Sequence, residues 1–181
     1  MRLPRRLGRE QGGYSLIELL TVIVILGIVL GALTSAFVQG SNAEVDLNRR
    51  FQAQLDAGTA LSRLRRDVHC ASSITPAGAS SSITLTLPSS CAGGGGQLSW
   101  CAVGSGTRYG LYRMAGSTCN STGKQYADYL TGASVFAYTA PQAGTSLAKL
   151  RVDLVINARP TKSVDSYDLV DDIVLRNSTR T

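Results

Sequence analysis

The sequence predicts an α+β fold in which one long helix packs against a mostly antiparallel β-sheet. Three observations lead to this fold class. No proline occurs between residues 14 and 70. The later part of this stretch places apolar residues every three or four positions, the period of an amphipathic helix. Beyond residue 75, short segments alternate apolar and polar residues, as strands do. With 181 residues, the chain has room for one globular domain and little else.

The first half of the expected helix, residues 14–38, has the composition of a membrane-spanning segment. No charged residue occurs between Glu18 and Glu44. The apolar run over residues 19–38 matches the ~20 residues that span a bilayer core. The preceding leader carries Arg2, Arg5, Arg6 and Arg9 against Glu10 alone. Because basic flanks stay in the cytoplasm, we expect the amino terminus there and the rest of the chain on the exported side.

The second half of the expected helix, residues 39–74, is predicted to be amphipathic and to cover one face of the sheet. Its apolar stripe consists of Leu47, Phe51, Leu55, Gly58, Leu61, Leu64 and Val68. At 1.5 Å per residue the whole helix would be roughly 80 Å long, which is more than one membrane crossing requires. A helix that lies half in lipid and half on a globular head accounts for the change of pattern.

Residues 75–181 are predicted to form a β-rich head of about five or six strands. The expected strands are residues 82–88, 97–103, 108–114, 134–140, 147–157 and a last one around 173–176. The second and third of these flank residues 104–107 and read as a hairpin. Residues 76–82, 92–96 and 115–125 are expected to be a linker and two loops, because small and polar residues dominate them.

Four cysteines lie on the expected exported side, at Cys70, Cys91, Cys101 and Cys119. An even count there suggests two disulfides, for which three pairings are possible. The absence of a C-x-x-C spacing argues against zinc and against a thioredoxin-like redox role. We favour Cys70–Cys91 and Cys101–Cys119 over a Cys91–Cys101 bridge, because the second pair flanks the hairpin with its following loop and Cys70 closes the helix near Cys91.

The net charge of +6 overstates the basicity of the chain without its leader. Removing residues 1–13 takes away four arginines and one glutamate and lowers the charge to +3. The remaining basic spots are Arg49-Arg50 and Arg63 with Arg65-Arg66. We interpret them as a solvated or phospholipid-facing side of the helix, and no nucleic-acid partner is predicted for the head.

The sequence offers little for catalysis. His69 is the one histidine, and a base needs both a nucleophile and an orienting partner within hydrogen-bond distance. The chain lacks G-x-S-x-G, a phosphate-binding glycine loop followed by lysine, and H-E-x-x-H. We therefore expect neither an enzyme nor a cofactor.

Two further clusters each have a functional and a structural interpretation. Carboxylates crowd the segment before the last expected strand, at Asp165, Asp168, Asp171 and Asp172. Close carboxylates on a loop can bind calcium, but the spacing does not match an EF-hand loop, and a solvated charged edge is favoured. Four larger side chains would line a ligand groove or fill the core, the latter being favoured: Trp100, Tyr109, Tyr112 and Met114.

The junction at residues 12–20, Gly-Gly-Tyr-Ser-Leu-Ile-Glu-Leu-Leu, is the most informative segment of the chain. A carboxylate inside a membrane helix costs roughly 2.5–3.5 kcal/mol at mid-bilayer, so Glu18 calls for a functional reason. An ordinary secretory signal is cut after its apolar run, and residues 40–43 are the one segment that would serve this purpose. Here the small residues stand before the run, so a cut at Gly13 would retain the apolar segment as an anchor.

These residues resemble the amino terminus of type IV pilins and of the pseudopilins of type II secretion systems. The resemblance implies that a dedicated peptidase cuts after Gly13 and that the new first residue, Tyr14, is N-methylated. Glu18 then stands fifth in the mature chain, as in the family, where this carboxylate meets the charged amino terminus of a neighbouring subunit. Tyr14 departs from the Phe or Met that is usual at the first position.

The same resemblance implies a pilin-like fold and a role in assembly. The expected protein is an inner-membrane precursor whose helix polymerises into a filament core, in a pilus or pseudopilus that is periplasmic or at the cell surface. The implied partners are a prepilin peptidase, other pilin or pseudopilin subunits, membrane lipid before assembly, and an inner-membrane platform driven by a cytoplasmic ATPase. Residues 61–68 and 173–177 are similar to segments of minor subunits, so we expect a minor pilin or pseudopilin.

Two other classes of function remain open at the level of sequence. A signal-anchored exported binding domain, such as an adhesin, would not polymerise and would need neither Gly13 nor Glu18. A membrane-tethered hydrolase is disfavoured because no catalytic constellation is present.

Overall fold

The computed structural model describes residues 13–91, 95–142, 146–159 and 166–177. The predicted leader, apart from Gly13, and Asp165 therefore lie outside the described residues. The chain divides into two compact units, Met1–Asp46 and Leu47–Thr181. Each unit is described by itself below.

One long helix, α1, covers Leu16–Cys70. In the first unit its side chains are almost all exposed, including the apolar ones between Leu16 and Val38. Among the described residues, α1 is the one helix long and apolar enough to cross a membrane, with a mean hydropathy of 2.8 in its most apolar window. None of that window is buried in protein, unlike the core helix of a soluble domain. The first half of α1 is therefore apolar on all sides, as lipid contact requires.

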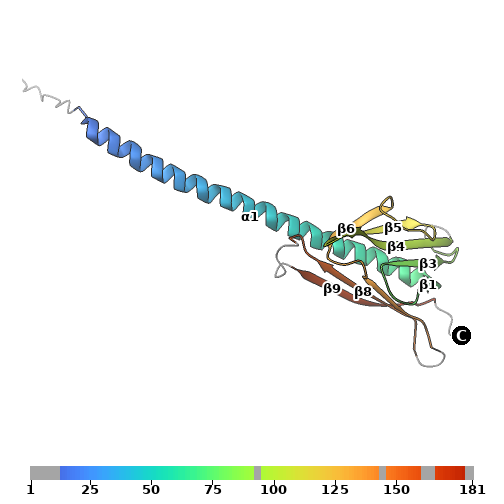
Figure 1. Ribbon diagram of the computed structural model, residues 1–181. Helices are drawn as coiled ribbons and strands as arrows, with labels where there is room; N and C mark the ends of the chain where they lie inside the picture. Colours follow the sequence, from blue (N-terminus) through green and yellow to red (C-terminus); the bar gives the residue numbers. More distant parts are fainter. Residues whose placement is uncertain (1–12, 92–94, 143–145, 160–165, 178–181) are drawn as a thin grey trace, which may run out of the picture. The chain divides into compact units, whose positions relative to one another are not determined.

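The second unit contains a nine-stranded antiparallel sheet built by the described residues (Figure 1). Its strands are β1 Ser73–Thr75, β2 Gly78–Ser80, β3 Ser82–Leu87, β4 Gly96–Ser105, β5 Arg108–Ala115, β6 Lys124–Leu130, β7 Phe136–Thr139, β8 Lys149–Ile156 and β9 Tyr167–Val174. Their order is β1-β3-β4-β5-β6-β8-β7-β2, and β9 pairs with the other side of β8. The predicted α+β class is confirmed.

The sheet is curled, because its two ends are neighbours in the sequence. β1 and β2 stand at opposite ends of the strand order, yet only Pro76 and Ala77 separate them in the chain. The connection between β6 and β8 is narrow, since a single pair, Leu130 with Ile156, joins them. The curled sheet encloses a core in which Trp100 and Phe136 are the largest fully buried side chains.

The structure corrects the predicted helical stripe. Leu61, Leu64 and Val68 are buried as expected, but Leu47, Phe51 and Leu55 are between 49 and 65% exposed. The buried face instead begins with three alanines, Ala53, Ala57 and Ala60. The predicted stripe and the observed buried face have the same spacing and join at Leu61. Periodicity could not distinguish them, so the larger side chains were favoured.

Five predicted strands correspond to β3, β4, β5, β7 and β8, and the predicted hairpin is β4–β5. The others differ. α1 ends at Cys70 rather than at residue 74, β1 occupies residues 73–75 where the helix was expected to end, and the expected linker contains β2. The expected loop over residues 115–125 ends where β6 begins, a strand that the sequence did not predict. The last strand begins at Tyr167 rather than near residue 173, since β8 supplies backbone partners that outweigh the low strand preference of its aspartates.

Candidate functional site

The predicted processing site lies just before α1 begins. Gly13, Tyr14 and Ser15 belong to no helix or strand, and Tyr14 is 82% exposed. The peptide bond between Gly13 and Tyr14 is therefore outside regular structure and accessible. Exposed segments with no helical hydrogen bonds are the backbone that proteases cleave.

The first turn of α1 places Glu18 in a helix-capping position that the sequence analysis missed. The Ser15 carbonyl accepts hydrogen bonds from the N–H groups of Glu18 (3.0 Å) and Leu19 (3.1 Å), which places Ser15 at the N-cap position. A serine at the cap with a glutamate three residues later is the capping-box pattern. A carboxylate in the first turn also complements the partial positive charge of a helix amino terminus. The Ser-x-x-Glu spacing was the signal for this role.

The apolar surface of α1 that follows this site is open. Gly27, Gly31 and Ser35 recur every four residues on one face. A methyl group added at Gly27 or Gly31 would meet no atom within 4 Å. Small residues at this spacing let two helices approach closely in a membrane. This part of α1 therefore has the surface of a helix that packs against other helices.

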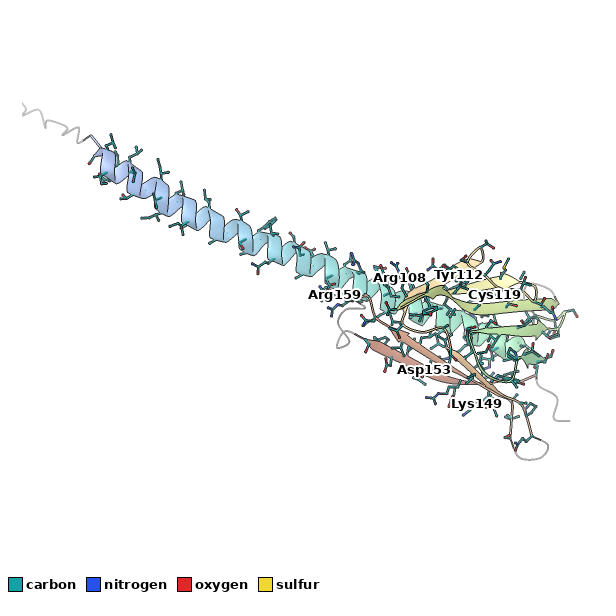
Figure 2. The ribbon with its side chains drawn as sticks, viewed as in Figure 1. Arg108, Tyr112, Cys119, Lys149, Asp153 and Arg159 are labelled. Carbon is teal, nitrogen blue, oxygen red and sulfur yellow. A yellow bond between two sulfur atoms is a disulfide. The ribbon has the colours of Figure 1, made fainter. Side chains whose placement is uncertain are left out.

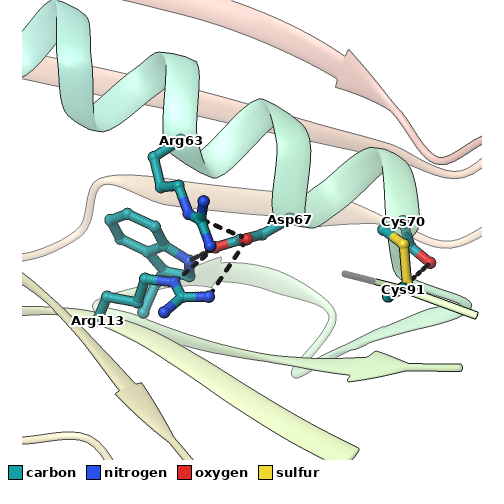
Figure 3. Close-up of polar contacts among 6 residues, drawn as sticks. Arg63, Asp67, Cys70, Cys91 and Arg113 are labelled. Atoms are coloured by element: carbon teal, nitrogen blue, oxygen red, sulfur yellow. Dashed lines mark hydrogen bonds and ion pairs between the residues drawn. A yellow bond between two sulfur atoms is a disulfide. The ribbon is translucent and has the colours of Figure 1, made fainter. Parts of the chain in front are cut away.

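A second polar site, in the Leu47–Thr181 unit, fastens α1 to the sheet (Figure 3). Asp67 of α1 is only 7% exposed. Its Oδ2 atom accepts hydrogen bonds from Trp100 Nε1 of β4 (3.1 Å) and Arg113 Nε of β5 (2.8 Å). Arg63, one helical turn earlier, places its Nε 3.5 Å from Asp67 Oδ1. A buried carboxylate is tolerated because the Trp100 and Arg113 donors satisfy it and Arg63 adds a nearby positive charge.

The aromatic candidates separate in the structure. Trp100 lies in the core with its indole N–H bonded to Asp67, and Tyr109 packs partly buried against the same core. Tyr112 and Met114 are half-buried along β5. The favoured interpretation, that these four side chains fill the core, therefore holds for Trp100 and Tyr109.

The cysteines form the two disulfides that the sequence favoured. Cys70–Cys91 joins the end of α1 to the segment after β3, with 6.0 Å between Cα atoms. Cys101–Cys119 joins β4 to the loop between β5 and β6, where Figure 2 labels Cys119. The Cα atoms of this pair are 5.9 Å apart. Both bridges lie in the Leu47–Thr181 unit.

The acidic cluster lies on a strand rather than on the loop that was predicted. Asp168, Asp171 and Asp172 all belong to β9, and Asp165 is outside the described residues. Asp171 pairs with Arg65 Nε (2.6 Å) and Asp172 with Lys149 Nζ (3.2 Å). In the described part of the chain, no three His, Cys, Asp or Glu side chains gather as metal ligands would. Two of the candidate calcium ligands are therefore engaged in ion pairs.

His69 is held by the sheet. Its Nδ1 atom lies 3.1 Å from the Val174 carbonyl oxygen of β9. A carbonyl oxygen only accepts, so Nδ1 carries the proton and donates. The hydrogen bond ties the last turn of α1 to the end of β9 and accounts for the histidine structurally.

Comparison with known proteins identifies the amino-terminal site. The family model of the prokaryotic N-terminal methylation motif matches residues 8–34, a segment that contains Gly13, Tyr14, Glu18 and the first part of α1. No curated protein and no solved structure matches the chain. This motif, which is diagnostic of type IV pilins and pseudopilins, stands here at the start of a long apolar helix that leads into an antiparallel sheet.

Proposed function

We propose that the protein is a minor structural subunit of a type IV pilus or of a type II secretion pseudopilus. The observation that carries the proposal is the methylation motif over residues 8–34, placed on an accessible junction before an exposed apolar helix. In this proposal residues 1–13 are the leader, 14–38 the membrane and filament-core segment, 39–74 the segment that meets the head, and 75–181 the head. Before assembly the protein is anchored in the inner membrane with the head exported.

Maturation prepares the helix for assembly. A prepilin peptidase cuts between Gly13 and Tyr14 and methylates the new amine of Tyr14, which is positively charged at neutral pH. This charge stands at the amino-terminal end of α1, where the helix dipole is also positive. Glu18 supplies the opposite charge. In a bundle of helices with a low dielectric constant, an amine of one subunit and a Glu18 of the next attract each other strongly when matched.

The charge pair also sets the stagger between subunits. A charged group buried without its partner costs several kcal/mol, so neighbouring helices are stable in the register that pairs them. The exposed apolar side chains of α1 supply the remaining contact, first with lipid and then with other subunits. The mechanism is assembly on an inner-membrane platform driven by a cytoplasmic ATPase, and no bond is made or broken by this chain.

The minor role rests on sequence likeness. Residues 61–68 and 173–177 resemble the corresponding segments of minor pilins and pseudopilins. The first of these segments contains Asp67, and the second covers the end of β9 and the residues after it.

The test is the mass of the amino-terminal peptide from cells with and without the prepilin peptidase. We expect a peptide that begins at methylated Tyr14 and is lost when the peptidase is absent. An uncut leader in both strains, or a cut after residue 38, would contradict the proposal and favour a signal-anchored or secreted binding domain.

A further inference from the structure

β9 presents a long open edge of the sheet. The strands at the two ends of the strand order, β1 and β2, are three residues each, and short end strands protect a sheet from further pairing. β9 has eight residues and pairs with β8 on one side. No strand of the described residues pairs with its other side. A row of unpaired backbone groups on such a strand is a template for another chain.

The hydrogen-bond pattern tells which groups face outward. The Leu175 N–H donates to the Ala148 carbonyl across the β8–β9 pair (3.0 Å). On β8, the Asp153 N–H points the opposite way and donates to the Val135 carbonyl (2.9 Å). Direction alternates along an antiparallel pair. The residues of β9 that direct their N–H and C=O groups away from β8 are therefore Asp168, Val170, Asp172 and Val174.

α1 closes one end of this edge and leaves the other end open. The Val174 carbonyl already accepts the hydrogen bond from His69. The backbone groups of Asp168, Val170 and Asp172 have no such partner among the described residues. A groove of about 550 Å³ lies beside the strand, lined among others by Arg65 and His69 of α1 and by residues 171–174. The open edge therefore adjoins space for the side chains of an added strand.

Exposed apolar side chains gather at the same edge. In the Leu47–Thr181 unit and outside α1, three large apolar side chains of the described residues are exposed, namely Leu147 (43%), Tyr167 (41%) and Val170 (46%). Tyr167 and Val170 belong to β9. Leu147 precedes β8 and lines the groove. Apolar side chains that cluster on a surface mark interaction sites.

Charge argues against a second copy of the same strand as the occupant. An antiparallel pair of β9 edges centred on Val170 would place Asp168 of each copy opposite Asp172 of the other. Like charges directly opposite each other destabilise a strand pair. Asp171 and Asp172 are paired with Arg65 and Lys149, but Asp168 has no cation among the described residues. The edge therefore favours a partner strand with an apolar residue to meet Val170 and a lysine or arginine to meet Asp168.

We propose that the outer edge of β9 binds an extended segment of a different subunit of the same filament, which adds to the sheet as a further strand. This inference rests on the proposed function. Backbone hydrogen bonds to Asp168, Val170 and Asp172 provide the affinity, as in other cases of strand addition. The alternating side chains provide the choice of partner.

Hydrogen exchange of individual amides tests the pairing in the mature full-length chain, compared between detergent micelles and sheared filaments. The amides of Leu169, Asp171 and Ile173 should be protected in both states, because they bond to β8. The amides of Asp168, Val170 and Asp172 should exchange rapidly in micelles and about a hundredfold or more slowly in filaments. Unchanged rapid exchange of these three amides in filaments would overturn the inference. Absence of the wild-type chain from filaments would instead contradict the proposed function.

Two substitutions at one position provide the matched comparison. Val170→Pro removes one outward N–H, a change that an edge strand tolerates. Val170→Thr keeps this N–H and the branched side chain. We expect both heads to unfold at the wild-type temperature, and the filament protection of Asp168 and Asp172 to be lost in Val170→Pro alone. Protection that survives in Val170→Pro would overturn the inference.

A photo-crosslinking amino acid in place of Val170 identifies the occupant in assembled filaments. Sequencing the crosslinked peptide should give a segment of another subunit with a lysine or arginine close to the crosslinked residue. A β9 peptide from a second copy, or no adduct, would overturn the inference.

Discussion

Glu18 is the one charged side chain among residues 14–43 and has two tasks that a single substitution can separate. Its place three residues after Ser15 serves the start of α1. Its negative charge serves the pairing with the mature amino terminus in the proposed filament. Glutamine satisfies the capping pattern as glutamate does, but it carries no charge.

We therefore expect Glu18→Gln to leave cleavage and methylation intact and to lower incorporation into filaments at least tenfold. Loss of one partner of a buried ion pair costs about 3–5 kcal/mol, and about 1.4 kcal/mol corresponds to a factor of ten. The measurement is the amount of mature chain in sheared filaments relative to the membrane fraction. Incorporation at the wild-type level would show that assembly does not depend on the charge.

Asp67 offers a second test at the scale of one residue. Asp67→Ala leaves Arg113 and the Trp100 indole N–H without their shared acceptor, and we expect the head to lose about 3–5 kcal/mol of unfolding free energy. Because Trp100 is the one tryptophan of the chain, its fluorescence during urea unfolding in detergent reports on the head. The exposed Asp56 provides the control, and Asp56→Asn should stay within about 0.5 kcal/mol of wild type. Equal stability of the two variants would contradict the role of Asp67.

At the scale of elements, one surface cluster fastens β5 to β6 next to the narrow connection with β8. Arg108 of β5 donates from two nitrogens to the Asp128 carboxylate of β6 and lies 4.3 Å from the centre of the Tyr129 ring. The Tyr129 N–H also donates to Asp128 (2.7 Å). Tyr129 has a φ of 63°, a value that a bulky residue rarely adopts. The cluster stabilises the chain where β6 meets β8.

The same cluster makes part of the stability depend on pH. Burial disfavours the charged form of Asp128, but the hydrogen bonds from Arg108 and Tyr129 outweigh it and hold the pKa of Asp128 below its ordinary value. A carboxylate with a lowered pKa stabilises the fold above its unfolded pKa of about 3.9, and this contribution is lost as the pH falls through the folded value.

We expect Asp128→Asn to lower the unfolding free energy near pH 7 by up to about 1 kcal/mol, since the pair is partly exposed. Below the folded pKa of Asp128 the difference from wild type should shrink. Urea midpoints measured across the acidic range provide the test. A difference that stays constant down to the lowest pH would mean that the ion pair contributes nothing.

Prediction of the elements succeeded where the pattern was local. β8 alternates Leu150, Val152, Leu154 and Ile156 toward the core, and the sequence shows this directly. β9 looks like a charged segment in the sequence because it contains three aspartates. In the structure two of them form ion pairs with Arg65 of α1 and Lys149 of β8. Those partners are distant in the sequence, so the segment did not look like a strand. The stripe of α1 was misplaced because the buried face begins with three alanines that have the same spacing as the larger side chains.

At the scale of the whole molecule, the two polar sites differ in how far the sequence reveals them. Gly13, Tyr14 and Glu18 lie within six consecutive residues, and the methylation motif is recognisable without a structure. Asp67, Trp100 and Arg113 come together only when the sheet has formed on the helix. The sequence revealed the disulfide pairing in part. Each bridge closes a short loop that the expected elements already suggested.

The two bridges also determine how the molecule would carry mechanical load. A filament subunit is pulled along its helix, and tension in α1 reaches Cys70 at the helix end. From there one covalent path passes through the sulfur atoms to Cys91 and bypasses residues 71–90, which include β1, β2 and β3. The second bridge bypasses residues 102–118 in the same way. Under tension this covalent path therefore enters the sheet at β4. β1, β2, β3 and β5 lie inside the two covalent loops.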